Sequence, residues 1–547
     1  MEEHQKTLTE NNALVSIPQM FYFCSMQDVH LIWYRRDLRV HDHAALAAAV
    51  ASGAPVLPLY IFEPDLWALP EHSRRQFDFL MESLTELDEA LTERGARLIV
   101  RKGNALDILA DLHRRHGIAA IHMYEETGLP WSRARDRAVR RWALQAGISL
   151  REQPQPEILR STGDSKSNAS WAGHVEQPRL KAPETIRAAT LAAGPWPIAE
   201  DFGLGADDCT GRQKGGRTAG VELLRGFLAG RGRRYRQDAE HPAAAEKTAS
   251  RLSPHLAFGT ISVREAWQAA HRARAAYMQD GDTTFAASLT GFLERLEWRA
   301  RSIQSLEDHP LPQTGSGEDI RPVPAMDDPR LATWIEGRTG FPLIDACIRS
   351  LRETGWLNFR MRAMLVGFAT HHLWMDWRRP AERLAALFTD FEPGIHYPQV
   401  LAQSAIRGQK APVVYNPVRL SLQLDPDGTF IRRWIPELAA LPDSYLHAPW
   451  EAPKAELARA GVILGQTYPM RMVDHVAAAK EARERIARLT RTSRPATAQP
   501  PHRPAPMQAD LPFRGMQARR LRKPKHGPAQ LSFDLGTPPP APHLRQI

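Results

Sequence analysis

Two arginines, Arg360 and Arg362, lie inside an apolar run from Leu357 to Met375 that has the pattern of one helix. Arg362 shares a helical face with the apolar positions that follow it, so we expect its guanidinium to be buried. A buried arginine without a partner costs about 3–5 kcal/mol, so it requires an acidic side chain or an anionic ligand. Segment FTDFEPGIHYPQ offers partners in Asp390, Glu392 and His396. Taken alone, such an Arg–Asp pair is structural more often than catalytic.

A second polar group precedes Pro254 in the segment TASRLSPHLAFGTIS. It consists of Ser250, Arg251 and Ser253, and a helix is predicted to begin after it. Serine before a proline in the first helical turn is an ordinary N-cap. A helix start with free backbone amides, two hydroxyls and an arginine is also suited to binding phosphate. The local pattern leaves both interpretations open.

A third group lies on the predicted helix FLERLEWRARSI. The inward face of this helix is marked by Phe292, Leu296 and Ile303. Arg295 and Arg299 are four residues apart and lie near the same face, while Glu294 and Trp298 form a neighbouring pair with the same spacing. An arginine beside a core stripe commonly extends to solvent or pairs with a carboxylate, which is the structural alternative to ligand binding here.

The amino-terminal part of the chain has the pattern of a parallel sheet. The apolar runs HLIWYRRDLRV, APVLPLYIF, RLIVRKG and AAIHMYEE are typical of strands. A helical segment from Ser73 to Gly95 separates two of them, with Phe77, Leu80, Leu84, Leu87 and Leu91 at helical spacing. Alternating strands and helices predict a doubly wound α/β domain that binds ligands at the carboxyl ends of its strands. No GxGxxG or Walker loop identifies such a ligand.

Composition divides the 547 residues into five parts. We expect an N-terminal extension (1–27), the α/β domain (28–153), a Pro-rich linker (154–216), an all-α domain (217–488) and a disordered basic tail (489–547). From Arg491 onward the chain carries ten Lys or Arg and two Asp, so most of its net charge of +9 belongs to the tail. The tail is either a solubilising segment or a loose electrostatic tether to DNA.

Composition also excludes several classes of protein. The first 25 residues do not resemble a secretory signal, and no long apolar run predicts a membrane span, so we expect a cytoplasmic protein. We also expect it to be a monomer. Cys24, Cys209 and Cys347 lie far apart in the sequence. Three separated cysteines predict no disulfide framework, zinc ribbon or four-Cys iron–sulfur cluster, and we expect no metal.

The motifs taken together resemble the photolyase and cryptochrome family. The resemblance covers residues 30–485 and rests on WYRRDLRVHDH, SRLSPHLAFGTIS, EGRTGFPLIDACIRSLRETGWLNFRMR, FEPGIHY, YNPV and DPDGTFIRRWIPEL. It implies an amino-terminal antenna domain and a helical domain that binds FAD in a folded form, facing a cavity for damaged DNA. A second antenna chromophore is implied without being identified, although Glu125 and Glu126 lie in a suitable region.

The resemblance also implies roles for individual residues. The implied FAD-binding set is Tyr235, Thr248, Ser250, Arg251, Leu252, Ser253, Arg295, Arg299, Asn358, Arg362, Asp390, Glu392 and His396. Arg362 matches an arginine that pairs with the flavin and with the acid at Asp390. The implied contacts to damaged DNA are Trp298, on which a lesion can stack, Glu294, and Arg360 at the mouth of the cavity.

Several positions depart from the family pattern. Arg295 stands where a glutamate usually faces the lesion, and His396 stands where an asparagine often faces the flavin. Of the three tryptophans that usually reduce the flavin, Trp377 is matched, but the proximal position falls near Val400 and the distal one near Pro324. We therefore predict that other aromatic residues supply electrons, and the candidates are Trp374, Tyr397 and Trp356. The alternative is that these aromatics are core residues only.

The function implied by the resemblance is light-driven repair of DNA. In such a reaction one electron from excited reduced FAD enters a cyclobutane pyrimidine dimer, the dimer splits and the electron returns. The altered glutamate and the missing proximal tryptophan favour an alternative, a cryptochrome-like photoreceptor without repair activity. Repair of (6-4) lesions is a third possibility, although Asn358 and Phe359 replace the expected His-Asn pair.

Overall fold

The computed structural model describes residues 28–155, 171–311, 321–404 and 414–492. The expected N-terminal extension therefore lies outside the described residues, as does the expected tail from residue 493 onward. The last helix, α22 (His475–Thr492), continues four residues beyond the predicted end of the helical domain. Among the described residues, none of the helices has the length and apolarity that crossing a membrane requires.

The amino-terminal domain contains one five-stranded sheet in which all strands are parallel. The strands are β1 (Val29–Tyr34), β2 (Val56–Phe62), β3 (Ile99–Lys102), β4 (Ile118–Tyr124) and β5 (Ser149–Gln153). Their order across the sheet is β3-β2-β1-β4-β5, so the chain starts in the centre and winds outward in both directions. The predicted doubly wound α/β fold is confirmed.

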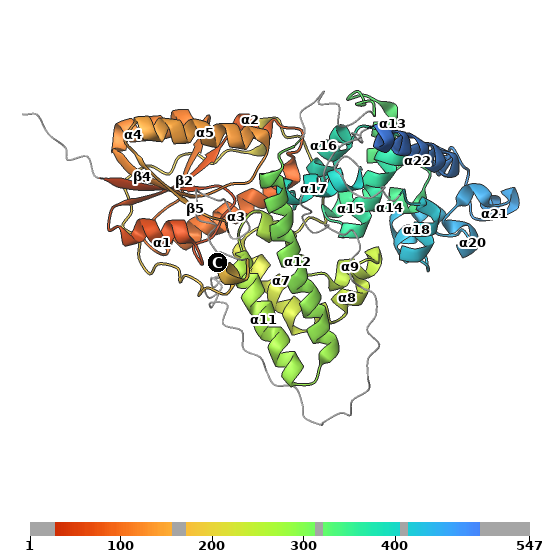
Figure 1. Cartoon of the computed structure of the whole chain (residues 1–547), viewed down its shortest axis with the longest axis horizontal. Coiled ribbons are helices and arrows are strands. Elements are labelled where there is room, and N and C mark those ends of the chain that lie inside the picture. Colours follow the sequence, from red (N-terminus) through yellow and green to blue (C-terminus); the bar gives the residue numbers. More distant parts are fainter. Residues whose placement is uncertain (1–27, 156–170, 312–320, 405–413, 493–547) are drawn as a thin grey trace, which may run out of the picture.

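Helices cover both faces of this sheet (Figure 1). Helices α1 (Ala44–Ala51) and α3 (Arg74–Thr92) lie on one face, and α4 (Ala105–His116) and α5 (Pro130–Gln145) lie on the other. Alternate residues of β1 enter the two cores, because successive strand side chains point in opposite directions. Ile32 and Tyr34 pack in the core with α1 and α3, whereas Leu31 and Trp33 pack in the core with α4 and α5.

Helix α3 forms where the helical spacing predicts it. Phe77, Leu80, Leu84, Leu87 and Leu91 are all buried in the core beneath the sheet. The helix ends before Gly95, whose φ of +89° is the left-handed conformation that glycine adopts at least cost. Its five apolar positions therefore attach α3 to the sheet along its whole length.

In the second domain the regular elements among the described residues are all helices, as predicted. Its helices are α7 (Arg217–Ala229), α8 (Tyr235–Asp238), α9 (Pro242–Thr248), α10 (Ser253–Ala257), α11 (Val263–Gln279), α12 (Thr283–Asp308), α13 (Pro329–Ile335), α14 (Pro342–Thr354), α15 (Phe359–Gly367), α16 (Arg378–Leu387), α17 (Pro393–Gln403), α18 (Pro417–Leu424), α19 (Thr429–Trp434), α20 (Asp443–Leu446), α21 (Lys454–Arg459) and α22. The long antiparallel pair α11 and α12 forms one side of the domain (Figure 1).

The apolar run from Leu357 to Met375 is not one α-helix, so this prediction was wrong. Asn358 has an extended backbone (ψ 161°), and α15 begins only at Phe359. After Gly367 the chain widens into one π-helical turn, η3 (Phe368–His372), and Trp374 then takes a φ of +51°. A residue whose backbone is in the left-handed region cannot continue a right-handed helix. Periodicity alone does not detect such a change, because all of these residues remain largely apolar.

The connection between the domains packs against the sheet. The amide of Val56 donates to the carbonyl of Arg187 at 2.7 Å, and the amide of Ala189 donates back to Val56 at 2.9 Å. The described part of the expected linker also contains two short helices, α6 (Trp171–Val175) and η1 (Ala199–Phe202). Backbone hydrogen bonds therefore hold the segment around Arg187 and Ala189 against β2.

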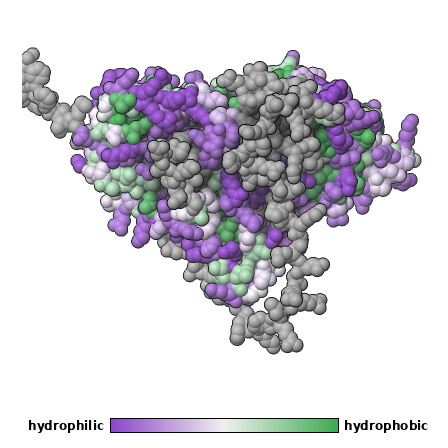
Figure 2. All heavy atoms as spheres, in the orientation of Figure 1, coloured by the Kyte–Doolittle hydropathy of each residue, from purple (hydrophilic) through white to green (hydrophobic). Residues whose placement is uncertain are grey.

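The end of β1 joins the two domains. The Arg36 guanidinium donates to the carbonyls of Ala257 at 2.9 Å and Phe391 at 2.6 Å, and it lies 3.5 Å from the Glu392 carboxylate. Gly259 adopts a φ of +67°, and a Cβ there would lie 2.2 Å from the carbonyl oxygen of Arg36. Only glycine permits this approach. The visible outer face of the molecule is mainly hydrophilic, with small separate apolar patches (Figure 2).

Candidate functional site

A cavity of about 210 Å³ opens in the helical domain between α12, α15 and α17. Its walls combine arginines with aromatic and small apolar side chains. It is lined by Tyr235, Ala239, Ala245, Ala249, Ser250, Arg251, Ser253, Leu256, Phe292, Arg295, Leu296, Trp298, Arg299, Trp356, Leu357, Asn358, Phe359, Arg362, Phe388, Asp390, Phe391, Glu392, Ile395, His396 and Gln399. Thirteen of the predicted cofactor, substrate and relay residues thus meet in one place.

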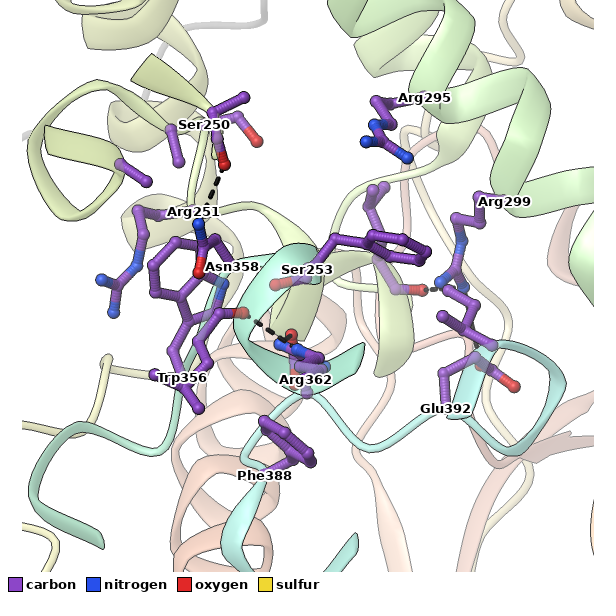
Figure 3. A pocket seen from close by; sticks show the side chains of 18 of the residues that line it. Ser250, Arg251, Ser253, Arg295, Arg299, Trp356, Asn358, Arg362, Phe388 and Glu392 are labelled. Carbon is purple, nitrogen blue, oxygen red and sulfur yellow. Dashed lines mark hydrogen bonds and ion pairs between the residues drawn. The ribbon is translucent and has the colours of Figure 1, made fainter. Parts of the chain in front are cut away.

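Arg251 and Trp356 form one wall of the cavity (Figure 3). The guanidinium carbon of Arg251 lies 4.3 Å from the centre of the Trp356 ring, and its Nε donates to Gln213 at 3.1 Å. Burial lowers the pKa of Arg251 to about 10, which leaves it a cation near neutral pH. Its φ of +60° is strained for a residue with a Cβ and holds the side chain in this direction.

Arg362 and Asp390 form the ion pair that the sequence led us to expect. The Arg362 guanidinium donates to an Asp390 oxygen at 2.7 Å and, through Nε, to the Leu357 carbonyl at 2.9 Å. Its guanidinium carbon lies 3.9 Å from the centre of the Phe388 ring. Three contacts therefore hold one cation at the floor of the cavity, and the π-face of Phe388 contributes to its stabilisation.

Several polar atoms along the cavity lack a partner among the described residues. They are the Ser253 hydroxyl, the carbonyl oxygen of the Asn358 side chain and the second carboxylate oxygen of Asp390. Asn358 uses its amide nitrogen to hold the Ala239 carbonyl at 2.9 Å. Buried polar groups in folded proteins are almost always hydrogen-bonded, so these three atoms indicate a polar ligand.

The opposite wall carries a chain of charges that continues into the α/β domain (Figure 3). Arg299 donates to the Leu256 carbonyl at 3.2 Å and lies 3.5 Å from Glu392. The same carboxylate pairs with Arg36 and accepts the amide of Gly394 at 3.1 Å, capping α17. Glu392 is thus held between two guanidinium groups, which fixes the loop before α17.

His396 lies on the first turn of α17 and is neutral. Its Nε2 is 3.0 Å from the carbonyl oxygen of Ala381, which requires the proton on that nitrogen and leaves Nδ1 as an acceptor. Burial lowers the pKa of His396 to about 4. The ring therefore brings an uncharged acceptor, rather than a cation, to the cavity wall.

Three side chains form an aromatic and cationic rim on the cavity. Trp298 and Phe359 meet edge to face, with ring centres 5.2 Å apart and planes at 86°. The guanidinium carbon of Arg295 lies 5.7 Å from the Trp298 ring and 5.0 Å from the Phe359 ring. Rings and a guanidinium arranged in this way are suited to stacking a planar base.

Four predicted binding residues lie outside the cavity wall. Thr248 donates its hydroxyl to the Ala244 carbonyl within its own helix, and Leu252 is packed in the core with α7, α11 and α12. Glu294 is exposed on α12, whereas Arg360 is partly buried with its guanidinium carbon 5.0 Å from the Tyr415 ring. The structure therefore does not bring these four together with the other predicted residues.

The four predicted relay aromatics occupy three different environments. Trp356 lines the cavity under Arg251, and Trp374 lies between the guanidinium groups of Arg321 and Arg485. Trp377 and Tyr397 are buried near each other, with ring centres 6.1 Å apart. Neither Trp377 nor Tyr397 lines the cavity itself.

Sequence reasoning missed part of the cavity. Phe388, Phe391, Ile395 and Gln399 line it but were not predicted. Ile395 and Gln399 lie three and seven residues after Glu392, so the helical spacing of α17 around the predicted residues Glu392 and His396 could have identified them. The ring of Phe388, which lies against Arg362, has no comparable signal in the sequence.

A second, smaller cavity of about 80 Å³ lies at the carboxyl ends of the strands. Arg35 and Arg135 fill much of this edge with ion pairs. Arg35 lies 2.9 Å from Asp136, and Arg135 lies 2.7 Å from Glu63 and 2.9 Å from Glu126. Glu126, noted above as suitably placed for an antenna chromophore, is thus engaged with arginines.

A doubly wound sheet domain that packs against a helical domain with an arginine-lined cavity defines the structural class of this protein. Known proteins match this class. Residues 30–183 match the family model described as DNA photolyase, and residues 292–488 match the FAD binding domain of DNA photolyase. The chain is 30% identical to the deoxyribodipyrimidine photo-lyase of Streptomyces griseus, covering 84% of this chain and 98% of that protein. It is also 30% identical to cryptochrome-1 of Arabidopsis thaliana, covering 82% of this chain and 69% of that protein.

Solved structures give the same assignment. The crystal structure of a bacterial class III photolyase from Agrobacterium tumefaciens superposes with a TM-score of 0.70 at 26% identity, covering 88% of this chain and all of that chain. The chain therefore belongs to the photolyase and cryptochrome family. Its relatives include proteins named deoxyribodipyrimidine photo-lyase and proteins named cryptochrome, so family membership alone does not choose between these two kinds of protein.

The cavity residues fit the FAD that this family membership implies. The unpartnered oxygens of Ser253, Asn358 and Asp390 can accept hydrogen bonds from N–H and O–H groups of such a cofactor. Arg251 and Arg362 offer buried positive charge for its diphosphate and ring oxygens. The alanines Ala245 and Ala249 leave room beside them.

Proposed function

We propose that this chain binds FAD in the cavity and uses blue light to split cyclobutane pyrimidine dimers in DNA. The observation that carries the proposal is the combination, in one cavity, of buried arginines, unpartnered acceptors and an aromatic rim. The first two features suit an anionic, hydrogen-bonding cofactor, and the third suits a base removed from its stack. Relatives named deoxyribodipyrimidine photo-lyase support the same activity.

The chemistry of this proposal divides between cofactor and chain. Bound FAD in its fully reduced form supplies, on absorbing light, the electron that opens the dimer. The residues of the chain bind and orient the cofactor, and they exclude water. Arg362 is oriented by Asp390 and Phe388, while the neutral His396 presents an acceptor instead of a positive charge. No side chain is required as a general acid or base for bond cleavage.

The rim provides the proposed contacts to the lesion. Trp298 offers a ring face, and Phe359 holds it from the side. Arg295 lies over both rings, where its charge can also attract phosphate. Stacking of a base on an aromatic side chain is worth about 1–3 kcal/mol, which offsets part of the cost of unstacking the damaged pair.

A second candidate function is a blue-light photoreceptor without repair activity. Arg295 occupies the position from which a glutamate is expected to face the lesion, and the neighbouring Glu294 is exposed outside the cavity. Val400, where the proximal tryptophan is expected, is an aliphatic core residue. Similarity to cryptochrome-1 of Arabidopsis thaliana is consistent with this candidate.

Irradiation of defined lesions tests the proposal. The FAD-loaded protein is reduced and mixed with oligonucleotides that carry either a cyclobutane dimer or a (6-4) lesion, then kept in blue light or darkness. We expect light-dependent loss of the cyclobutane dimer alone. Full flavin reduction without loss of either lesion would refute repair and favour the photoreceptor. Loss of only the (6-4) lesion would identify that lesion, and not the cyclobutane dimer, as the substrate.

The variant Trp298→Ala should weaken binding of dimer-containing DNA by about tenfold or more, the equivalent of one lost stacking interaction. Trp142→Ala is the matched control, because Trp142 is a partly buried tryptophan on α5 that does not line the cavity. Equal affinity in the two variants would remove Trp298 from the proposed site.

A further inference from the structure

The Tyr397 phenol forms a buried hydrogen bond that crosses between the domains. It donates to Oε1 of Glu71 at 2.5 Å, although the two residues are 326 positions apart. Glu71 lies in the loop between α2 (Pro64–Trp67) and α3, whereas Tyr397 lies on α17. Tyr397 is 3% exposed and Glu71 is 8% exposed, so the contact is removed from bulk water.

The environment of Glu71 makes its carboxylate a good proton acceptor. Burial raises the pKa of Glu71 above its ordinary value, and the nearby Glu382 carboxylate raises it further. The hydrogen bond from Tyr397 opposes both effects, because it stabilises the charged form. Among the residues that the structure describes, Tyr397 is the side chain that hydrogen-bonds this carboxylate. Once Tyr397 has lost an electron, transfer of its proton to Glu71 would leave both buried side chains without charge.

Aromatic rings connect Tyr397 to the cavity on one side and to Trp377 on the other. The Tyr397 ring centre lies 5.2 Å from that of His396 and 6.3 Å from that of Phe391, and both of these residues line the cavity. The Trp377 ring centre lies 6.1 Å from Tyr397. Tyr397 is therefore the redox-active ring between the buried tryptophan and the cavity wall.

We propose that Tyr397 and Glu71 form a proton-coupled electron relay that replaces the missing proximal tryptophan. This inference rests on the proposed binding of FAD. Tyr397 gives one electron to a bound oxidised flavin in its light-excited state, and its phenolic proton passes along the hydrogen bond to Glu71. The products on the chain are a neutral tyrosyl radical and a protonated Glu71. Trp377, or a thiol reductant in solution, returns the electron, and Glu71 returns the proton.

The hydrogen bond is needed because oxidation makes a phenol strongly acidic. A tyrosine that lost an electron and kept its proton would leave a cation in a buried site, which is costly. A preformed acceptor at 2.5 Å lets the electron and the proton leave together. The α/β domain thereby contributes a positioning residue, Glu71, to the electron supply of the helical domain.

A purely structural role for the contact makes different predictions, and transient absorption separates the two. Protein purified with oxidised FAD is excited with a blue laser pulse in H₂O and in D₂O. We expect a neutral tyrosyl radical in the unmodified chain, formed more slowly in D₂O. Tyr397→Phe should lose this radical, and Glu71→Gln should retain FAD while forming the radical about tenfold more slowly, a difference of about 1.4 kcal/mol in barrier.

Tyr468→Phe is the matched control for these variants. The Tyr468 phenol also donates to a buried carboxylate, that of Asp345 at 2.7 Å, but neither residue lines the cavity. We expect the control to form the tyrosyl radical as the unmodified chain does. If the unmodified chain shows a tryptophan radical alone, or if Glu71→Gln keeps both the rate and the isotope effect, the relay is refuted. Protein that cannot retain FAD would instead refute the proposed function.

Discussion

Replacing Asp390 by asparagine tests whether Arg362 depends on its acid. The substitution keeps the size of the side chain and removes its charge. Arg362 retains its hydrogen bond to the Leu357 carbonyl and its contact with Phe388, so the change isolates the ionic partner. We expect the free energy of unfolding to fall and the affinity for FAD to decrease with it.

The expected size of the effect follows from the burial of the pair. The side chain of Arg362 is 15% exposed and that of Asp390 is 2% exposed. A hydrogen bond between charged groups contributes about 1.5–3 kcal/mol, and leaving a buried charge unpaired costs about 3–5 kcal/mol. Because Arg362 keeps slight solvent access and two other contacts, we expect a loss of about 3 kcal/mol.

Urea unfolding followed by far-ultraviolet circular dichroism measures this loss. Asp328→Asn is the matched control, because Asp328 pairs with Arg330 at 2.8 Å at the surface, where the arginine side chain is 50% exposed. Asparagine also preserves the N-cap that Asp328 provides to α13. The control should lose less than about 1 kcal/mol. Equal losses in the two variants would show that water, and not Asp390, neutralises Arg362.

Two further predictions concern single residues of the cavity. Burial lowers the pKa of His396 from its ordinary value of 6.5 to about 4 in the folded chain, so its contribution to stability is present above pH 6.5 and disappears as the pH falls toward 4. Urea unfolding at several pH values measures this effect. On acidification, the free energy of unfolding of His396→Gln should fall by up to about 3 kcal/mol less than that of the unmodified chain. An unchanged pH profile would contradict a neutral buried ring. Arg251→Gly should relieve about 1 kcal/mol of left-handed strain while raising the dissociation constant for FAD about tenfold or more, measured by flavin fluorescence titration. Unaltered FAD affinity would place the cofactor away from this wall.

The sequence was sufficient to predict the structural features that depend on local periodicity. Five of the buried positions of α3 and the alternation along β1 could be predicted because a helix and a strand repeat at fixed intervals. The pairing of Arg362 with Asp390 could be predicted for a different reason. A guanidinium on an apolar face needs an anion, the segment from Phe388 to Gln399 offered Asp390, Glu392 and His396, and the family resemblance implied Asp390.

Features that depend on long-range contacts could not be predicted. The π-helical turn after Gly367 leaves the apolar pattern of the run unchanged, so periodicity extended the helix too far. The contact between Tyr397 and Glu71 joins residues of different domains, and nothing in either local segment indicates the other. The contact of Trp356 with Arg251 could not be predicted either, because it depends on the positive φ of Arg251.

Through Arg36, the α/β domain supports one wall of the cavity in the helical domain. Arg36 donates a hydrogen bond to the Phe391 carbonyl and pairs with the Glu392 carboxylate. The Glu392 carboxylate in turn pairs with Arg299. A substitution of Arg36, which does not line the cavity, can by this route displace the loop that does.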